Sequence, residues 1–280
     1  MLDLEGVAPP RERNAIARVT GFARPYFLGL GYSVALFAAG WTTWRGRAAI
    51  VELCSRLGYR HDRREPIHLP AVSVDEAIGA EVPIRVHAID AVDGNVSEKE
   101  LVVLNSLVVS SRSSSIFELG TFDGRTTRNL AANAGDEGHV FTLDLPRSSV
   151  STLTAPIHPH EQQYVDKAAS GERYRGTAEE ARITQLYGDS GTFDFSRYFG
   201  TIDFVFVDGS HAYHYVVNDS LVALKLLRAE GGVITWHDYG RWDGVTRALN
   251  DLRTNHVQFA AIAYVDGTTL AFLRIGPPPR

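Results

Sequence analysis

Two residues that can move a proton follow an apolar run in the segment FVFVDGSHAYHY, residues 204–215. Phe204 to Val207 read as a buried strand, and Asp208 and His211 come shortly after it. A spacing of three residues is close to one helical turn, so both side chains can face one pocket. Histidine titrates near neutral pH and can act as a general base. We therefore predict a catalytic pair, Asp208 and His211, at the end of this strand.

Other apolar runs also end in carboxylates. They are 115–120 with Glu118, 139–145 with Asp144, 182–189 with Asp189, and 231–238 with His237 and Asp238. Helical patterns separate the runs, and the chain closes on two strand-like runs around an Asp-Gly turn, a hairpin signal. This order predicts an α/β fold, a doubly wound, mostly parallel seven-stranded sheet with a C-terminal antiparallel hairpin. Ligands of such sheets bind beyond the carboxyl ends of the strands, so we expect these side chains to share one crevice.

The first third of the chain differs from this pattern. We divide the sequence into a helical N-terminal extension with a connector, residues 1–92, and a ligand-binding domain, residues 93–280. Proline and irregular spacing make 61–86 a connector. Ser97 and Glu100 form a capping box, S-x-x-E, which predicts the first helix of the domain.

Composition limits the class of protein. The net charge of −5 argues against a nucleic-acid binder, which usually has a basic face. The single cysteine, Cys54, allows no intramolecular disulfide and suggests a reducing, cytoplasmic location. Its apolar neighbours at helical spacing favour a packing role over a nucleophilic one.

Residues 25–44, PYFLGLGYSVALFAAGWTTW, carry no charge and are long enough to cross a bilayer. Glycines, hydroxyl side chains and Pro25 interrupt the apolar run. We predict a helical region that packs in a homo-oligomer or against the domain. A membrane-associated helix is the second interpretation.

The loop ELGTFDGRT, residues 118–126, indicates the kind of cofactor. Its glycines, Gly120 and Gly124, have the spacing G-x-x-x-G and not the dinucleotide pattern G-x-G-x-x-G. A pyrophosphate needs backbone donors and cations, whereas this crevice is acidic. An acidic crevice suits a cationic ligand with sugar hydroxyls, and S-adenosylmethionine has a sulfonium, an ammonium and a ribose.

Four segments together resemble a known family: FELGTFDGRTT, VFTLDLP, YGDS, and FVFVDGSHAYHY with the later WHDYG. From Asp93 to Ile275 the chain resembles class I S-adenosylmethionine-dependent methyltransferases, and in particular small-molecule O-methyltransferases of the catechol and macrolide-sugar types. The resemblance implies that Asp144 accepts hydrogen bonds from the ribose hydroxyls. It implies this set of cofactor-binding residues: Glu118, Gly120, Asp123, Gly124, Asp144, Asp189 and Ser190.

The same resemblance implies a divalent metal, Mg²⁺ or Mn²⁺, held by Asp208, His237 and Asp238, with His211 as the base for a small-molecule hydroxyl acceptor. His237 departs from the family pattern, which has oxygen ligands there. Magnesium prefers oxygen, whereas imidazole suits transition ions. A metal-free hydrogen bond from His237 to a pocket carboxylate is the alternative.

Two other classes of function stay open at this point. One is a nicotinamide-dependent oxidoreductase, and the other is a non-catalytic S-adenosylmethionine-binding partner protein on the same fold. Residues 146–181 are too long for a simple crossover, so they are a candidate lid or substrate-recognition element.

Overall fold

A computed structural model of the chain describes residues 15–43, 46, 49, 50, 53, 65–146, 161–167 and 169–276. It divides into two compact units, Met1–Arg63 and Arg64–Arg280. The sequence pattern predicts the boundary between residues 92 and 93, whereas the two compact units divide between Arg63 and Arg64. Residues 65–92 belong to the second unit because they pair with its sheet and hydrogen-bond to its helices.

The first unit contains helix α1 (Ala15–Ala39), with Pro25 inside it, and the short 3₁₀ helix η1 (Gly40–Thr42). Large apolar side chains of α1 are exposed: Tyr26, Phe27, Leu28, Leu30, Tyr32, Val34 and Phe37. Among the described helices, none combines the length and the hydropathy that crossing a bilayer requires. The predicted packing of Cys54 falls outside the described residues.

The second unit is built on one eight-stranded sheet with the order β1-β7-β8-β6-β5-β2-β3-β4. The strands are β1 (Ala71–Val72), β2 (Ser115–Leu119), β3 (His139–Asp144), β4 (Ile183–Tyr187), β5 (Phe204–Val207), β6 (Gly232–Trp236), β7 (Ala263–Val265) and β8 (Ala271–Ile275). β8 runs antiparallel to β6 and β7, and the other pairs are parallel. The mostly parallel sheet and its C-terminal hairpin are confirmed.

The sheet has one strand more than predicted. The extra strand is β1, two residues of the predicted connector that pair with β7. Tyr264 donates a backbone hydrogen bond to Pro70 and Asp266 donates one to Val72. A strand this short carries too little periodicity to be read from sequence, and its pairing partner lies almost 200 residues away.

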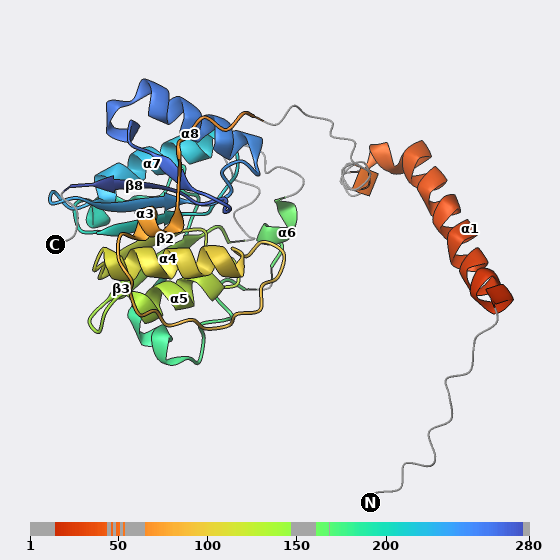
Figure 1. Cartoon of the computed structure of the whole chain (residues 1–280), viewed down its shortest axis with the longest axis horizontal. Coiled ribbons are helices and arrows are strands. Elements are labelled where there is room, and N and C mark those ends of the chain that lie inside the picture. The colour runs from red at the N-terminus through yellow and green to blue at the C-terminus, as the bar shows by residue number, and fades with distance from the viewer. Residues whose placement is uncertain are drawn as a thin grey trace, which may run out of the picture. The chain divides into compact units, whose positions relative to one another are not determined.

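Helices cover both faces of the sheet (Figure 1). Along β5 the side chains alternate, so that Phe204 and Phe206 join one core while Val205 and Val207 join the other. The first core is covered by α4 (Glu98–Ser110) and α5 (Arg125–Asn133), and the second by α7 (Tyr213–Leu226) and α8 (Asp243–Asn255). Strands that are buried on both faces read as continuous apolar runs, as FVFV does.

The remaining short elements are α3 (Val74–Ile78), α6 (Gln162–Val165), η3 (Ala178–Arg182), η4 (Ser196–Tyr198) and η5 (Val257–Phe259). The predicted capping box starts α4: Ser97 Oγ accepts from the Glu100 N–H, and Glu100 accepts from the Ser97 N–H.

Two polar residues of α5, Arg125 and Asn129, connect residues 87–89 to the rest of the second unit. Arg125 is fully buried, and its guanidinium donates to the carbonyls of Ala88, Ile89 and Val96. One turn further, Asn129 exchanges hydrogen bonds with the backbone of His87. Buried donors are stable only when they are paired, so these bonds define the path of the connector beside the strand ends.

Candidate functional site

The crevice lies where the strand order reverses. β2 is flanked by β3 on one side and by β5 on the other, so the loops that follow β2 and β5 diverge at their carboxyl ends. Two adjoining cavities open there, with volumes of about 140 Å³ and 280 Å³. Both are lined by Gly120, Phe122, Tyr164, Asp208, Gly209 and His211.

The loop after β2 requires a special backbone. Gly120 has φ +102, and a Cβ there would lie 2.0 Å from the carbonyl oxygen of Asp208. Gly124 has φ +86, and a Cβ there would lie 2.7 Å from Gly171 and from the Tyr174 ring. Only glycine adopts these angles at low cost. Both glycines therefore let neighbouring chain segments approach the loop.

The first cavity is lined by six of the predicted site residues: Gly120, Asp144, Asp189, Ser190, Asp208 and His211. Asp144, at the end of β3, pairs through Oδ2 with Lys167 Nζ at 2.9 Å and accepts a hydrogen bond from Ser170. Asp189, after β4, accepts from Tyr215 Oη at 3.1 Å. The structure thus brings together carboxylates from three different strand ends around one cavity.

Asp219 of α7 also lines this cavity and was missed by the sequence analysis. Its carboxylate accepts from Asn218 Nδ2 at 3.1 Å and from Ser190 Oγ at 3.2 Å. Burial raises its pKa to about 7, although both hydrogen bonds lower it. A signal was present, since Asp219 lies on the buried face of the helix with Val216, Ser220 and Ala223 at spacings of three and four.

Glu118, Asp123 and Gly124 do not line the first cavity. Glu118 is fully buried in β2, where its Oε2 accepts from Thr127 and Thr142 and its Oε1 has no hydrogen-bond partner among the described residues. Burial raises the pKa of Glu118 to about 8, against the lowering effect of both hydroxyls. Asp123 lines the second cavity and pairs with Arg173 at 3.0 Å.

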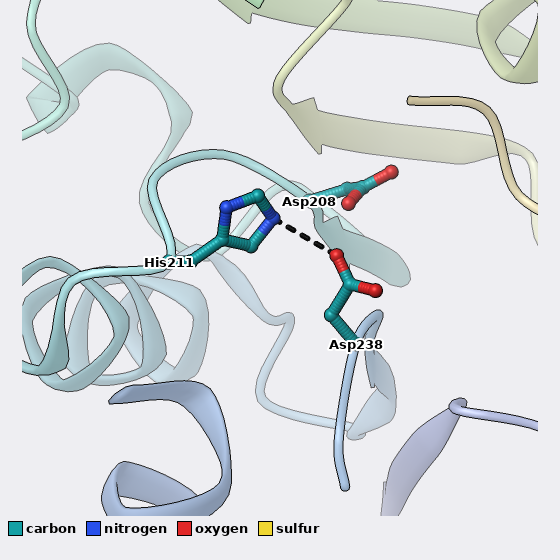
Figure 2. A group of neighbouring side chains, drawn as sticks. All are labelled: Asp208, His211 and Asp238. Carbon is teal, nitrogen blue, oxygen red and sulfur yellow. Dashed lines mark ion pairs between the residues drawn. The ribbon is translucent and has the colours of Figure 1, made fainter. Parts of the chain in front are cut away.

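Two carboxylates hold the predicted base between them. His211 Nε2 lies 2.9 Å from Asp238 Oδ2, the ion pair drawn in Figure 2, and Nδ1 lies 2.8 Å from Glu161 Oε1. The ring also stacks on Trp242, with centroids 4.3 Å apart and planes 5° apart. Burial lowers the pKa of His211, but the two carboxylates outweigh it and raise the pKa to about 9. The imidazole is therefore protonated at neutral pH in this arrangement, unlike the neutral base that the sequence suggests.

His237 ends β6 with a carboxylate at each ring nitrogen. Nδ1 lies 3.1 Å from Asp208 Oδ1, and Nε2 lies 3.3 Å from Glu100 Oε2. Burial opposes its protonation, but the nearby carboxylates, Asp208 first, raise its pKa well above the usual value. Burial would raise the pKa of Glu100, and the hydrogen bond and charge of His237 lower it overall. Glu100 therefore joins the site besides capping α4, a second role that its position in the capping box does not reveal.

The group of side chains placed to hold a metal differs from the predicted set in one residue. Asp208, His211 and Asp238 offer ligand atoms within 4.8 Å of one another (Figure 2). His237 is outside this group, and, like His211, it has a carboxylate at each ring nitrogen. Two carboxylates and an imidazole fit a divalent transition ion such as Mn²⁺. Asp238 itself has φ +68, a left-handed backbone that is costly for a non-glycine residue and recurs at functional sites.

The second cavity is more polar. Beyond the shared residues it is lined by Asp93, Asn95, Asp123, Arg241 and Trp242, among others. The T-shaped pair of Phe122 and Tyr164, with centroids 5.6 Å apart, belongs to the linings of both cavities. His211 and Asp208 therefore lie where a ligand in one cavity meets a ligand in the other.

Comparison with known proteins gives the class of this domain. Residues 117–239 match a family described as methyltransferase domain. This segment runs from β2 through the end of β6, so it contains both motifs around His211 and Asp238. Within this segment the chain is similar to methyltransferase domains.

Solved structures match the chain at low sequence identity. The O-methyltransferase TomG from Streptomyces achromogenes, involved in tomaymycin synthesis and in complex with SAM, is 18% identical over 66% of this chain and 83% of its own, with a TM-score of 0.47. An O-methyltransferase from Bacillus cereus in complex with SAH is 17% identical over 81% of this chain and 96% of its own, with a TM-score of 0.42. No curated protein matches the chain in sequence. We base the proposal below on the geometry of the site and on the family match.

Proposed function

We propose that this protein is an S-adenosylmethionine-dependent O-methyltransferase that acts on a hydroxyl group of a small molecule. The observation that carries the proposal is the position of His211. It lies at the junction of two cavities, beside Asp208 and in an ion pair with Asp238. One cavity has the acidic, phosphate-repelling lining that a sulfonium cofactor requires, and the other is open to an acceptor.

The residues of the first cavity fit S-adenosylmethionine. Asp144 offers two carboxylate oxygens to ribose hydroxyls, and Asp189, Ser190 and Asp219 also belong to the lining. The apolar lining by Leu119, Leu143 and Leu145 suits a purine ring. When bound, the cofactor supplies an electrophilic methyl group on a positively charged sulfur.

In the proposed reaction His211 removes the proton of the acceptor hydroxyl as the new O–CH₃ bond forms. The S–CH₃ bond breaks, its electron pair stays on sulfur, and S-adenosylhomocysteine leaves with the O-methyl product. The imidazole must be neutral to accept the proton. With a pKa near 9, the rate should rise with pH through the neutral range.

Metal assistance is a second mechanism for the same reaction. Asp208, His211 and Asp238 would hold the ion, with His237 as a hydrogen-bonding neighbour. A divalent cation would lower the pKa of the acceptor hydroxyl. Under this mechanism His211 is a ligand, so it cannot also be the base. Activity that collapses in chelator and returns with Mn²⁺ or Mg²⁺ favours the metal mechanism, and full activity of exhaustively chelated protein favours His211 as base.

Calorimetric titration of the full chain with S-adenosylhomocysteine and with NAD tests the cofactor. We expect S-adenosylhomocysteine to bind and NAD not to bind. The reverse result would favour an oxidoreductase. Transfer of labelled methyl groups to a panel of phenols, catechols and sugars then tests catalysis, and binding without transfer to any of them would favour a non-catalytic partner protein.

We also propose a homo-oligomer that forms through the first unit, because the large apolar side chains of α1 are exposed in the single chain. Light scattering should show more than one chain per particle for the full chain and a single chain per particle for a variant that begins at residue 60. The same number of chains per particle in both proteins would contradict this assembly. Partition of the full chain into anionic vesicles would favour the membrane-associated alternative.

A further inference from the structure

Glu161 makes contacts that no pattern in the sequence predicts. It lies directly before α6, and only 5% of its surface is exposed. Its Oε1 accepts the backbone N–H of His211 at 2.5 Å and lies 2.8 Å from Nδ1 of the same residue, an ion-pair distance at an angle outside hydrogen-bond geometry. One carboxylate oxygen therefore contacts both the main chain and the ring of the proposed base, across 50 residues of sequence.

The stacking of Trp242 on the imidazole does not fix the position of the ring completely. It keeps the plane of the ring parallel to the indole, but it does not prevent the ring from shifting within that plane. Nε2 pairs with Asp238, and this ion pair must break before Nε2 can accept a proton from the substrate. Glu161 contacts Nδ1 and the backbone N–H of His211 at the same time, so it can keep the ring in place while Nε2 exchanges Asp238 for the substrate.

We propose that Glu161 is a positioning residue for His211: it accepts the backbone N–H, and its negative charge 2.8 Å from Nδ1 keeps the ring proton on Nδ1, so that Nε2 is the nitrogen that takes the acceptor proton. The inference rests on the proposed function. In the step, the acceptor O–H proton moves to Nε2, the Nδ1 proton stays on the ring facing Glu161, and the methyl group leaves sulfur for oxygen. A carboxylate that accepts from one imidazole nitrogen selects the tautomer and increases the basicity of the other nitrogen.

The same stretch of chain reaches the first cavity. Lys167 pairs with Asp144 and donates from Nζ to the Tyr164 carbonyl at 2.8 Å, and Ser170 donates to Asp144. Before α6, Glu161 contacts the His211 imidazole, and after α6, Lys167 and Ser170 contact the Asp144 carboxylate. Glu161 and Lys167 both line the first cavity, but they pair with different groups. A change at Glu161 should therefore lower turnover most, and a change at Lys167 should lower cofactor affinity most.

The test uses the full chain with Glu161→Gln, Glu161→Ala and a matched control, Glu172→Gln, which removes an exposed carboxylate eleven residues further on. Initial rates are measured with labelled S-adenosylmethionine and the acceptor that the wild type methylates fastest. Affinity is measured by calorimetry with S-adenosylhomocysteine. We expect kcat to fall about 10- to 100-fold in the alanine variant, because small errors of position cost about that much. The glutamine variant, which keeps an acceptor for the His211 N–H, should lose less.

The expected pattern is a loss in kcat with S-adenosylhomocysteine affinity within about twofold of wild type and with an unaffected control. Wild-type kcat in Glu161→Ala would overturn the proposal. So would equal losses of kcat and of S-adenosylhomocysteine affinity in both variants, because they would mean that Glu161 only holds the fold of its segment.

A second measurement does not depend on turnover. Crystal structures of wild type and Glu161→Ala should show the His211 ring in one orientation in the wild type and in a different orientation or several in the variant. An unchanged ring overturns the role of Glu161 whether or not an acceptor is found. Absence of methyl transfer by the wild type would instead contradict the proposed function.

Discussion

Replacement of Asp219 by asparagine tests the electrostatics of the first cavity through stability. Asp219 is 1% exposed, and burial raises its pKa to about 7 from an ordinary value of 3.8. A carboxyl whose pKa is raised by folding stabilises the fold below its unfolded pKa. That stability is lost as the pH rises through the folded pKa. The wild type should therefore become less stable between about pH 4 and pH 7.

The size of the effect follows from the shift. Three pKa units at about 1.4 kcal/mol each give about 4 kcal/mol, an upper bound because the interior relaxes around a new charge. Asparagine has nearly the same shape, and its amide can pair with Asn218 and with the Ser190 hydroxyl, which donates or accepts. Asp219→Asn should therefore match the wild type near pH 4, and its advantage should grow with pH to a few kcal/mol at pH 8.

Urea unfolding at pH 5, 6, 7 and 8, followed by tryptophan fluorescence, measures the difference. Asp136→Asn is the matched control, because Asp136 lies exposed in a surface turn. We expect the control to keep the pH slope of the wild type and Asp219→Asn to lose the part that Asp219 contributes, while the buried Glu118, with a pKa raised to about 8, keeps its own part. Identical slopes in wild type and Asp219→Asn would refute the assignment of a strained, buried carboxyl at this position.

Three further predictions concern the site directly. Gly120→Ala places a Cβ 2.0 Å from the Asp208 carbonyl oxygen at a positive φ, so the free energy of unfolding should fall by about 2 to 4 kcal/mol in thermal unfolding. The control is Gly135→Ala, which has φ +74 and no atom near the new Cβ, so it should lose only the smaller stability that the backbone conformation costs. Equal losses in the two variants would contradict a steric role for Gly120. Asp144→Ala should weaken S-adenosylhomocysteine binding roughly ten- to a hundredfold in calorimetry, and unchanged affinity would remove Asp144 from the ribose site. His211→Ala should lower kcat about 10²- to 10⁴-fold with S-adenosylhomocysteine affinity preserved, and wild-type turnover would assign proton removal to another group.

Much of the fold follows from local patterns in the sequence. The period of the apolar residues separates the strands from α5, α7 and α8, and Ser97 with Glu100 marks the start of α4 because capping is a contact between neighbours. The carboxylates Asp144, Asp189, Asp208 and Asp238 share an edge because parallel strands end on the same side of a sheet. Their convergence around one crevice is a consequence of chain order and could be predicted.

The pairing of those side chains depended on contacts that sequence patterns do not encode. Glu100 meets His237 across 137 residues, and Glu161 meets His211 across 50. Such contacts depend on the twist of the sheet and on how each helix packs, which place side chains to within an ångström or two, whereas periodicity only assigns a face. The same limit explains Glu118: the pattern places a carboxylate near the strand end, and only the packed structure shows that it is enclosed by two threonines. The sequence determined which strand ends carry carboxylates, and the tertiary structure decided which of them face the cavity, which pair with histidine, and which have a pKa that burial raises.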